Sequence, residues 1–241
     1  MRKIFLFFII SNYCYGVTVL LDPGHGGAFD GCVSFSKKLL EKDITLDIAH
    51  RIGALLKKRN ITPVYSRTTD RHFNKQLDKN THFNPDAITD AQEKVFYTHH
   101  LTTDLTERSK IIKDQKPDIV ISLHANSGSK AMRGFELFIP FEKKFSTRSY
   151  ILAAYIHQAL AHNTEQDWLG TMGNLNIRDR GIRQARFNVL RNLSCPAVLI
   201  ELDYITHSEV EKNFLSTAYK QKLAQIIADA IIAYIQESKK I

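Results

Sequence analysis

The sequence has few of the residues that interrupt or cross-link a chain. It contains only three cysteines and six prolines in 241 residues, and no linker rich in proline, glycine and serine divides it. It also has no repeat of fixed period and no low-complexity tract, which excludes repeat architectures. A chain of this length can bury one sizeable hydrophobic core. We therefore expect a single domain.

Long apolar runs are also scarce. The longest covers residues 4–10 and is too short to span a bilayer, so we do not expect an integral membrane protein. It follows a basic start and precedes a small, polar segment, which is the order of a secretory signal. We expect a signal peptide over 1–16, although a buried first strand is the alternative. Residues 17–241 would then be exported and act in the periplasm or at the cell wall.

Acidic residues are in the minority. Lysine and arginine outnumber aspartate and glutamate by 33 to 25, which gives a formal net charge of +8. The basic residues are scattered, whereas a nucleic-acid-binding protein would gather them in a stripe with aromatic side chains. We therefore expect no nucleic acid partner. The positive charge of an exported protein would favour binding to an anionic surface such as the cell wall. The alternative is that the charge serves solubility alone.

Apolar segments alternate with amphipathic segments along the rest of the chain. Continuous or alternating apolar runs predict strands over 17–21, 62–66, 118–123, 133–139, 188–190 and 197–200. Helical periodicity predicts helices over 43–58, with Asp43 as N-cap, and over 105–114, 150–162 and 208–236. Apolar strands separated by helices indicate a mostly parallel sheet covered on both faces. We expect a three-layer α/β fold.

Three of these strands lead to a residue that can bind a metal or transfer a proton. The first strand precedes His25, the strand over 118–123 ends at His124, and the last strand ends at Glu201. Active sites of open α/β sheets lie at the carboxyl ends of the strands, so these side chains should meet at one edge. Glu41 joins them because it precedes the helix beside the first strand.

These residue types suit a catalytic metal ion. Two histidines and a carboxylate leave a tetrahedral zinc ion one open position, and a second carboxylate can act as general base. Gly24, Gly26 and Gly27 allow the backbone to bend sharply beside a ligand. Alone, a histidine after a strand or a glutamate at a strand end is more often structural. No His-Glu-x-x-His run is present, which excludes the common metalloprotease helix.

A series of motifs extends over nearly all of the chain from residue 17 to residue 235. In order, they are LLDPGHGG, EKDITLDIA, SRTTD, LTERSKI, ISLHAN, GFELFIP, RGIRQARFNVLRNLSCPAVLIE and HSEVEKNFL. The series resembles the zinc-dependent N-acetylmuramoyl-L-alanine amidases, the type-3 cell-wall amidase family. The resemblance implies a six-stranded sheet flanked by helices and a Zn²⁺ cofactor. It implies peptidoglycan as substrate, cut between N-acetylmuramic acid and L-alanine during cell-wall remodelling or division.

The resemblance also implies a role for each candidate residue. His25, Glu41 and His124 correspond to the zinc ligands, and Glu201 corresponds to the catalytic carboxylate. A zinc peptidase that acts within the stem peptide could use the same four residues. A wall-binding protein that keeps the fold without catalysis is a second alternative. A protein activator could be a further partner.

The sequence departs from the family pattern in several places. Asp203 replaces a glycine that usually follows the catalytic glutamate, and His207 replaces an asparagine. The segment 71–104 is an insertion, much longer than the family connection between strand and helix. Its aromatic residues favour a role outside the core, as a wall of the substrate groove or a docking site, with a disordered loop as the alternative. The stretch before RGIRQA has room for one helix and a loop, so we expect no inhibitory helix there.

Overall fold

A computed structural model describes residues 16–83, 88–165 and 179–238. The predicted signal peptide lies outside the described residues except for Gly16. The stretch that bears on an inhibitory helix, residues 166–178, also lies outside them. Within the described part of the chain, no helix is both long enough and apolar enough to cross a membrane.

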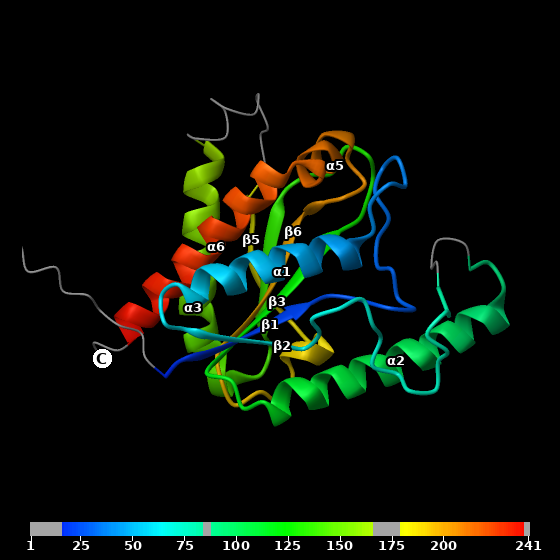
Figure 1. The fold of residues 1–241 in the computed structure, drawn as a ribbon, viewed down its shortest axis with the longest axis horizontal. Coiled ribbons are helices and arrows are strands. Elements are labelled where there is room, and N and C mark those ends of the chain that lie inside the picture. The colour runs from blue at the N-terminus through cyan, green and yellow to red at the C-terminus, as the bar shows by residue number, and fades with distance from the viewer. Residues whose placement is uncertain (1–15, 84–87, 166–178, 239–241) are drawn as a thin grey trace, which may run out of the picture.

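A six-stranded sheet forms the centre of the domain (Figure 1). Its strands are β1 (Thr18–Pro23), β2 (Thr62–Tyr65), β3 (Ile119–Asn126), β4 (Phe135–Pro140), β5 (Asp179–Ala185) and β6 (Ala197–Tyr204). Their order across the sheet is β2-β1-β3-β6-β4-β5. All neighbouring pairs are parallel except β4 and β6. The carboxyl ends of β1, β3 and β6 therefore meet at one edge, as the sequence predicts.

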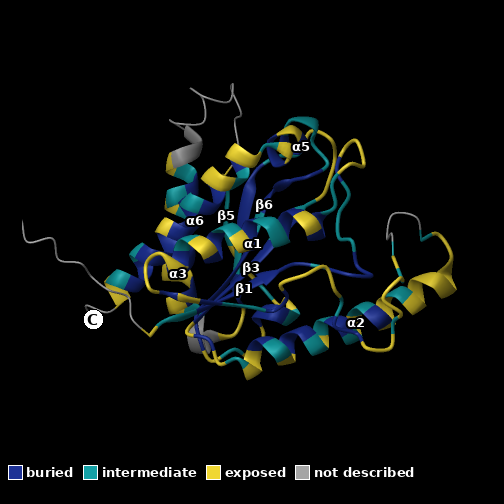
Figure 2. Cartoon of the chain, in the orientation of Figure 1, coloured by how far each residue is buried: buried dark blue, intermediate teal, exposed yellow. Residues whose placement is uncertain are grey.

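Helices cover both faces of the sheet and complete the three layers. On one face lie α1 (Glu41–Lys57), α3 (Lys143–Glu165) and α6 (Thr217–Ser238), with α6 packed against the other two. On the other face, α2 (Ala91–Asp114) packs against the short 3-10 helix η2 (Asn188–Leu190). The short helix α5 (Ser208–Leu215) follows β6. Figure 2 shows the central strands β1, β3 and β6 as largely buried. The predicted fold class is confirmed.

The alternation of side chains along the strands decides which residues face α2. Side chains on a strand point to opposite faces in turn. The residues that pack with Ile112 of α2 are Leu20, Val120 and Leu199, and their neighbours along the strands pack on the α1 side. His124 is four residues after Val120 on β3, and Glu201 is two residues after Leu199 on β6. Both therefore lie on the face toward α2. The strand pattern thus directs both side chains toward the space beside α2.

The sequence prediction is wrong about one strand. Residues 188–190 form the 3-10 helix η2 and not a strand. The strand that the prediction lacks is β5, at the edge of the sheet. The sequence of β5 is DRGIRQA, and all of its residues are exposed or half-buried. An edge strand of this kind lacks the apolar run on which the prediction depends.

Several helix boundaries also differ from the prediction. Leu40 is the N-cap of α1, so Asp43 lies inside the first turn. The start of α2 is far ahead of residue 105, because Asp90 caps it by accepting hydrogen bonds from two main-chain amides. The predicted helix over 208–236 is two helices, since Ser216 has extended backbone angles.

Part of the 71–104 segment belongs to the core, contrary to our expectation. Phe73 and Asn74 are buried, and the main-chain N–H groups of both donate to the Asp104 carboxylate. These bonds fix the beginning of the segment to its end, which is part of α2. The amino-terminal turns of α2 project from the domain (Figure 1), and Val95 and Phe96 are exposed there.

A buried carboxylate links the ends of the central strands. Asp22 of β1 accepts hydrogen bonds from the hydroxyls of Ser66 (2.5 Å) and Ser122 (2.7 Å). Its Oδ1 also lies 3.3 Å from Nη1 of Arg108. Burial raises the pKa of Asp22, but Arg108 and the two hydroxyls outweigh this effect and leave the pKa lowered. Asp22 is therefore ionised in the folded protein.

We expect Asp22→Asn to lower the free energy of unfolding by about 3–5 kcal/mol at about pH 7, because Arg108 loses its counter-charge. The folded-state pKa is lowered, so the stabilisation is present above the unfolded value of about 3.9 and is lost as the pH falls through the folded value. Urea unfolding of both proteins at a series of pH values measures this. The exposed Asp229→Asn is the control, and a difference that does not shrink in acid would contradict the prediction.

Candidate metal centre

His25 lies on the loop after β1 with a backbone conformation that is rare for a residue with a Cβ atom. Its φ is +60°, and Gly26 and Gly27 that follow also have positive φ values. This run of left-handed backbone turns the chain sharply after Pro23. The imidazole of His25 then meets that of His124 edge to face, with 5.1 Å between ring centroids.

Two glycines leave the space that the donor side chains occupy. A Cβ atom on Gly24 would lie 2.5 Å from Cε1 of His124. A Cβ atom on Gly31 would lie 2.5 Å from Oε2 of Glu41 and 2.7 Å from Cδ2 of His25. Real Cβ atoms do not approach other atoms so closely, so any larger residue would displace a donor.

The structure brings His25, Glu41 and His124 together as a group that could hold a metal ion. Oε1 of Glu41 is 3.1 Å from Nε2 of His25 and 3.0 Å from Nδ1 of His124. The donor atoms all lie within 4.8 Å of one another. Bonds of about 2.0–2.1 Å in a tetrahedral zinc site place ligand atoms roughly 3.3 Å apart. The donor set therefore fits a single ion.

Main-chain amides orient the carboxylate of Glu41, the first residue of α1. Oε2 accepts a hydrogen bond from Cys32 N (2.8 Å), and Oε1 accepts one from Ala125 N (3.0 Å). Burial alone would raise the pKa of Glu41, but His25 and His124 hold it well below its usual range. Glu41 is therefore ionised and fixed in orientation. Sequence analysis missed the two amides because every residue carries one.

Glu201 lies beside the donor group on the same edge of the sheet. It is the register partner of His124 on β3 and of Glu136 on β4. Burial raises the pKa of Glu201 to about 7; His124 opposes the rise, and Glu41 and Glu136 add to it. Its Oε2 is buried and has no hydrogen-bond partner among the described residues. A buried polar atom left without a partner is costly and often marks a functional position.

A pocket of about 270 Å³ connects these groups with α2. His25, His124 and Glu201 line one part of it. Apolar side chains line much of the rest: Phe29, Leu101, Leu105, Phe187, Val189 and Leu199. The end of the 71–104 segment thus borders the pocket. A larger hollow of about 460 Å³ lies around Val17 and Asp118, at the opposite ends of the strands, and contains none of these candidate residues.

The family of the chain follows from a comparison with known proteins. Residues 19–233 match the model of the N-acetylmuramoyl-L-alanine amidase family Amidase_3. The chain belongs to this amidase family. The resemblance seen in the sequence motifs is therefore confirmed.

Similar proteins include curated amidases and solved structures. The N-acetylmuramoyl-L-alanine amidase LytC of Bacillus subtilis (strain 168) is 29% identical over 226 residues, which are 93% of this chain but only 37% of LytC. YqiI of the same organism is 30% identical over 224 residues, 92% of this chain and 86% of YqiI. The structure of the amidase AmiC2 of Nostoc punctiforme has a TM-score of 0.66 at 27% identity, and the match covers 91% of this chain and 97% of that one.

Two of the departures from the amidase pattern, Asp203 and His207, make structural contacts at the end of β6 and at the start of α5. Asp203 replaces the usual glycine and is buried, and its Oδ1 accepts hydrogen bonds from Gly134 N (2.7 Å) and Tyr204 N (2.8 Å). His207 is the N-cap of α5 and accepts a hydrogen bond from Glu209 N at Nδ1 (3.2 Å). The two substitutions therefore have structural roles beside the site.

We expect Gly24→Ala to reduce metal affinity by about 10–100-fold, the usual effect of disturbing the groups that orient a ligand. The new methyl group would push the His124 ring out of the donor set. Competition with a chelator measures the affinity. Gly181→Ala is the control: it also places a methyl group on a glycine, at positive φ but in open space. Equal affinity of Gly24→Ala and wild type would contradict the crowding argument.

Proposed function

We propose that the chain is an N-acetylmuramoyl-L-alanine amidase whose zinc ion is held by His25, Glu41 and His124. The exported protein would act on peptidoglycan and cut it between the lactyl group of N-acetylmuramic acid and the first L-alanine of the stem peptide. One observation carries the proposal: His25 and His124 of the metal-donor group line the same pocket as Glu201, whose buried Oε2 has no hydrogen-bond partner among the described residues. Family membership and the likeness to LytC support the choice of substrate.

The chemistry of the donor group supports zinc. Two imidazoles and one carboxylate are a common ligand set for catalytic zinc, and they leave a position for water or substrate. When bound in such a site, zinc polarises a carbonyl group and lowers the pKa of a coordinated water to about 7. His25 and His124 keep Glu41 ionised and main-chain amides orient it, so this chain offers the ligand without rearrangement.

Glu201 would move the protons of the reaction. A general base works best with a pKa near the working pH, and burial brings the pKa of Glu201 to about 7. Its unpaired Oε2 can accept a proton from the attacking water and then donate it to the alanine nitrogen. The second transfer is required because an unprotonated amine is too basic to leave.

The same four residues could serve a zinc peptidase that cuts within the stem peptide. The products distinguish the two enzymes, since an amidase releases intact stem peptides from the glycan. A wall-binding protein would retain peptidoglycan without hydrolysing it. Mass spectrometry of digested sacculi separates all three functions.

Purified protein is expected to hold about one zinc ion per chain, and His25→Ala and His124→Ala are each expected to lose it. Two remaining donors are too few to retain the ion in a site of this kind. Elemental analysis after gel filtration measures the content. His50→Ala, on the exposed side of α1, is the matched control. Full zinc content in both donor variants would exclude this donor group.

Glu201→Gln is expected to retain zinc but to release stem peptides about 10²–10⁴-fold more slowly, the usual contribution of a general acid–base group. Glutamine has nearly the same shape but cannot take up a proton. Rates on purified sacculi, with zinc content measured on the same sample, provide the comparison. Glu209→Gln, which changes a partly exposed carboxylate, is the control. Undiminished turnover would remove Glu201 from the mechanism.

A further inference from the structure

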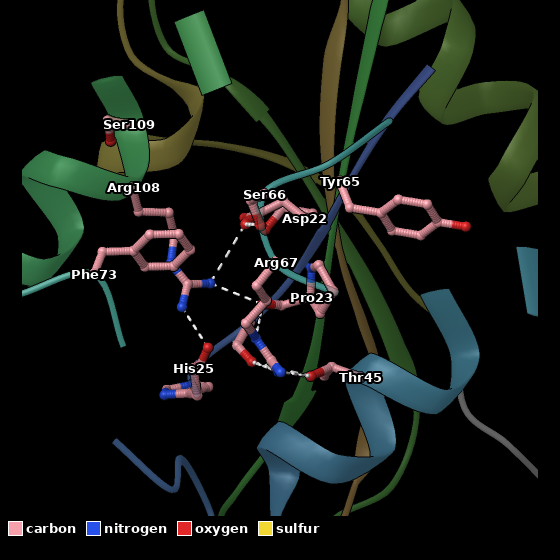
Figure 3. A network of polar contacts seen from close by, with 12 residues as sticks. Asp22, Pro23, His25, Thr45, Tyr65, Ser66, Arg67, Phe73, Arg108 and Ser109 are labelled. Atoms are coloured by element: carbon pink, nitrogen blue, oxygen red, sulfur yellow. Dashed lines mark hydrogen bonds and ion pairs between the residues drawn. The ribbon is translucent and has the colours of Figure 1, made fainter. Parts of the chain in front are cut away.

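Two buried arginines hold the loop that carries His25 (Figure 3). Arg67 donates to the carbonyl of Pro23 through Nε (3.1 Å) and to that of Gly24 through Nη2 (2.9 Å). Arg108 donates to the carbonyl of Pro23 through Nη1 (2.8 Å) and to that of His25 through Nη2. Three consecutive carbonyl groups of the loop therefore accept hydrogen bonds from cationic donors.

His25 needs this support because of its backbone conformation. A left-handed φ is unfavourable for a residue with a Cβ atom, and it persists only where the surroundings enforce it. Hydrogen bonds from a charged donor are about twice as strong as neutral ones. The planar guanidinium of Arg108 reaches Asp22 and two loop carbonyls at once. A lysine ammonium has no fixed fork with which to do the same.

The 71–104 segment in turn holds Arg108. The ring of Phe73 lies against the guanidinium, with 4.7 Å from Cζ to the ring centroid, and Figure 3 shows the two side chains together. Asp104 lies one helical turn before Arg108, and its Oδ2 is 4.0 Å from Nη2 of Arg108. Its other oxygen accepts the main-chain N–H of Asn74 (2.9 Å). The guanidinium is thus enclosed between this segment and the metal-binding loop.

We propose that Arg108 is a positioning residue for the metal centre and that the 71–104 segment acts on the centre through it. Arg108 contacts the donor group through the main-chain carbonyl of His25. Phe73 and Asp104 restrict the guanidinium to the orientation in which it bonds that carbonyl. The inference rests on the proposed metal site, and it gives the buried part of the insertion a role in the reaction.

Arg108→Lys tests the proposal, because it keeps a positive charge near Asp22 but removes the fork. Zinc affinity, measured by competition with a chromogenic chelator, is expected to fall about 10–100-fold. In zinc-free protein, the amides of Gly24 and Gly26 are expected to exchange hydrogen faster than in wild type. Both are hydrogen-bonded in the loop, to the carbonyls of Leu123 (2.8 Å) and Phe29 (2.9 Å). The amide of Val120 in the sheet core should exchange as in wild type.

Two further variants make the result decisive. Arg51→Lys changes an arginine of α1 that pairs with Asp47, and it should alter neither affinity nor exchange. Phe73→Leu keeps Arg108 and an apolar side chain but removes the ring, and it should weaken zinc binding less than Arg108→Lys does. If Arg108→Lys does not fold, the zinc affinity and the amide exchange of Phe73→Leu test the proposal in its place.

Wild-type zinc affinity together with wild-type exchange at Gly24 and Gly26 would overturn the proposal. Equal acceleration at Val120 would also overturn it, because the change would then be a general loss of stability. Failure of the proposed function looks different: the wild-type protein would bind no zinc or release no stem peptides. In that event the exchange rates of the zinc-free protein still decide whether Arg108 positions the loop.

Discussion

The buried ion pair of Asp22 and Arg108 is the interaction on which the site depends. Two guanidinium groups lie close together in the interior, and burial together with Arg108 lowers the pKa of Arg67 to about 10. Asp22 supplies negative charge between the strand ends and opposes this lowering, so Arg67 remains protonated at neutral pH. Both arginines bind the loop carbonyls, and Arg67 also binds the carbonyl of Lys42 in the first turn of α1 (2.7 Å). One charge cluster thereby fixes the backbone beside two of the three candidate metal ligands, His25 and Glu41.

The sheet positions the remaining two candidate residues, His124 and Glu201. Parallel neighbours β3 and β6 place His124 and Glu201 side by side in register, both on the face toward α2. The strands behind them are apolar and fully buried, so these positions are held rigidly. A carboxylate that is buried there without a full set of partners is destabilising. The fold tolerates this cost because its two cores contribute stability elsewhere.

The sequence revealed the fold class and the four candidate residues because their signals are local. An apolar run that ends in a polar side chain predicts both a strand and its functional end. The position of β5 was missed because the residues of this edge strand are exposed or half-buried and form no local apolar run. The roles of Arg67 and Arg108 were missed for a related reason. Their motifs are visible, but the carbonyl groups that they bind belong to another segment and carry no side-chain signature.

The 71–104 segment shows how one insertion can contain parts with different physical constraints. Phe73 and Asp104 are buried against Arg108, so a change there acts on a charged group that holds the metal-binding loop. Val95 and Phe96, on the projecting turns of α2, are exposed. Because α2 is continuous from Ala91 to Asp114, Asp104 lies on the same helix as the exposed residues, but only the buried residues contact Arg108. The length of the insertion therefore does not determine its effect on the site. That effect depends on the few buried residues at the two ends of the insertion, which contact Arg108.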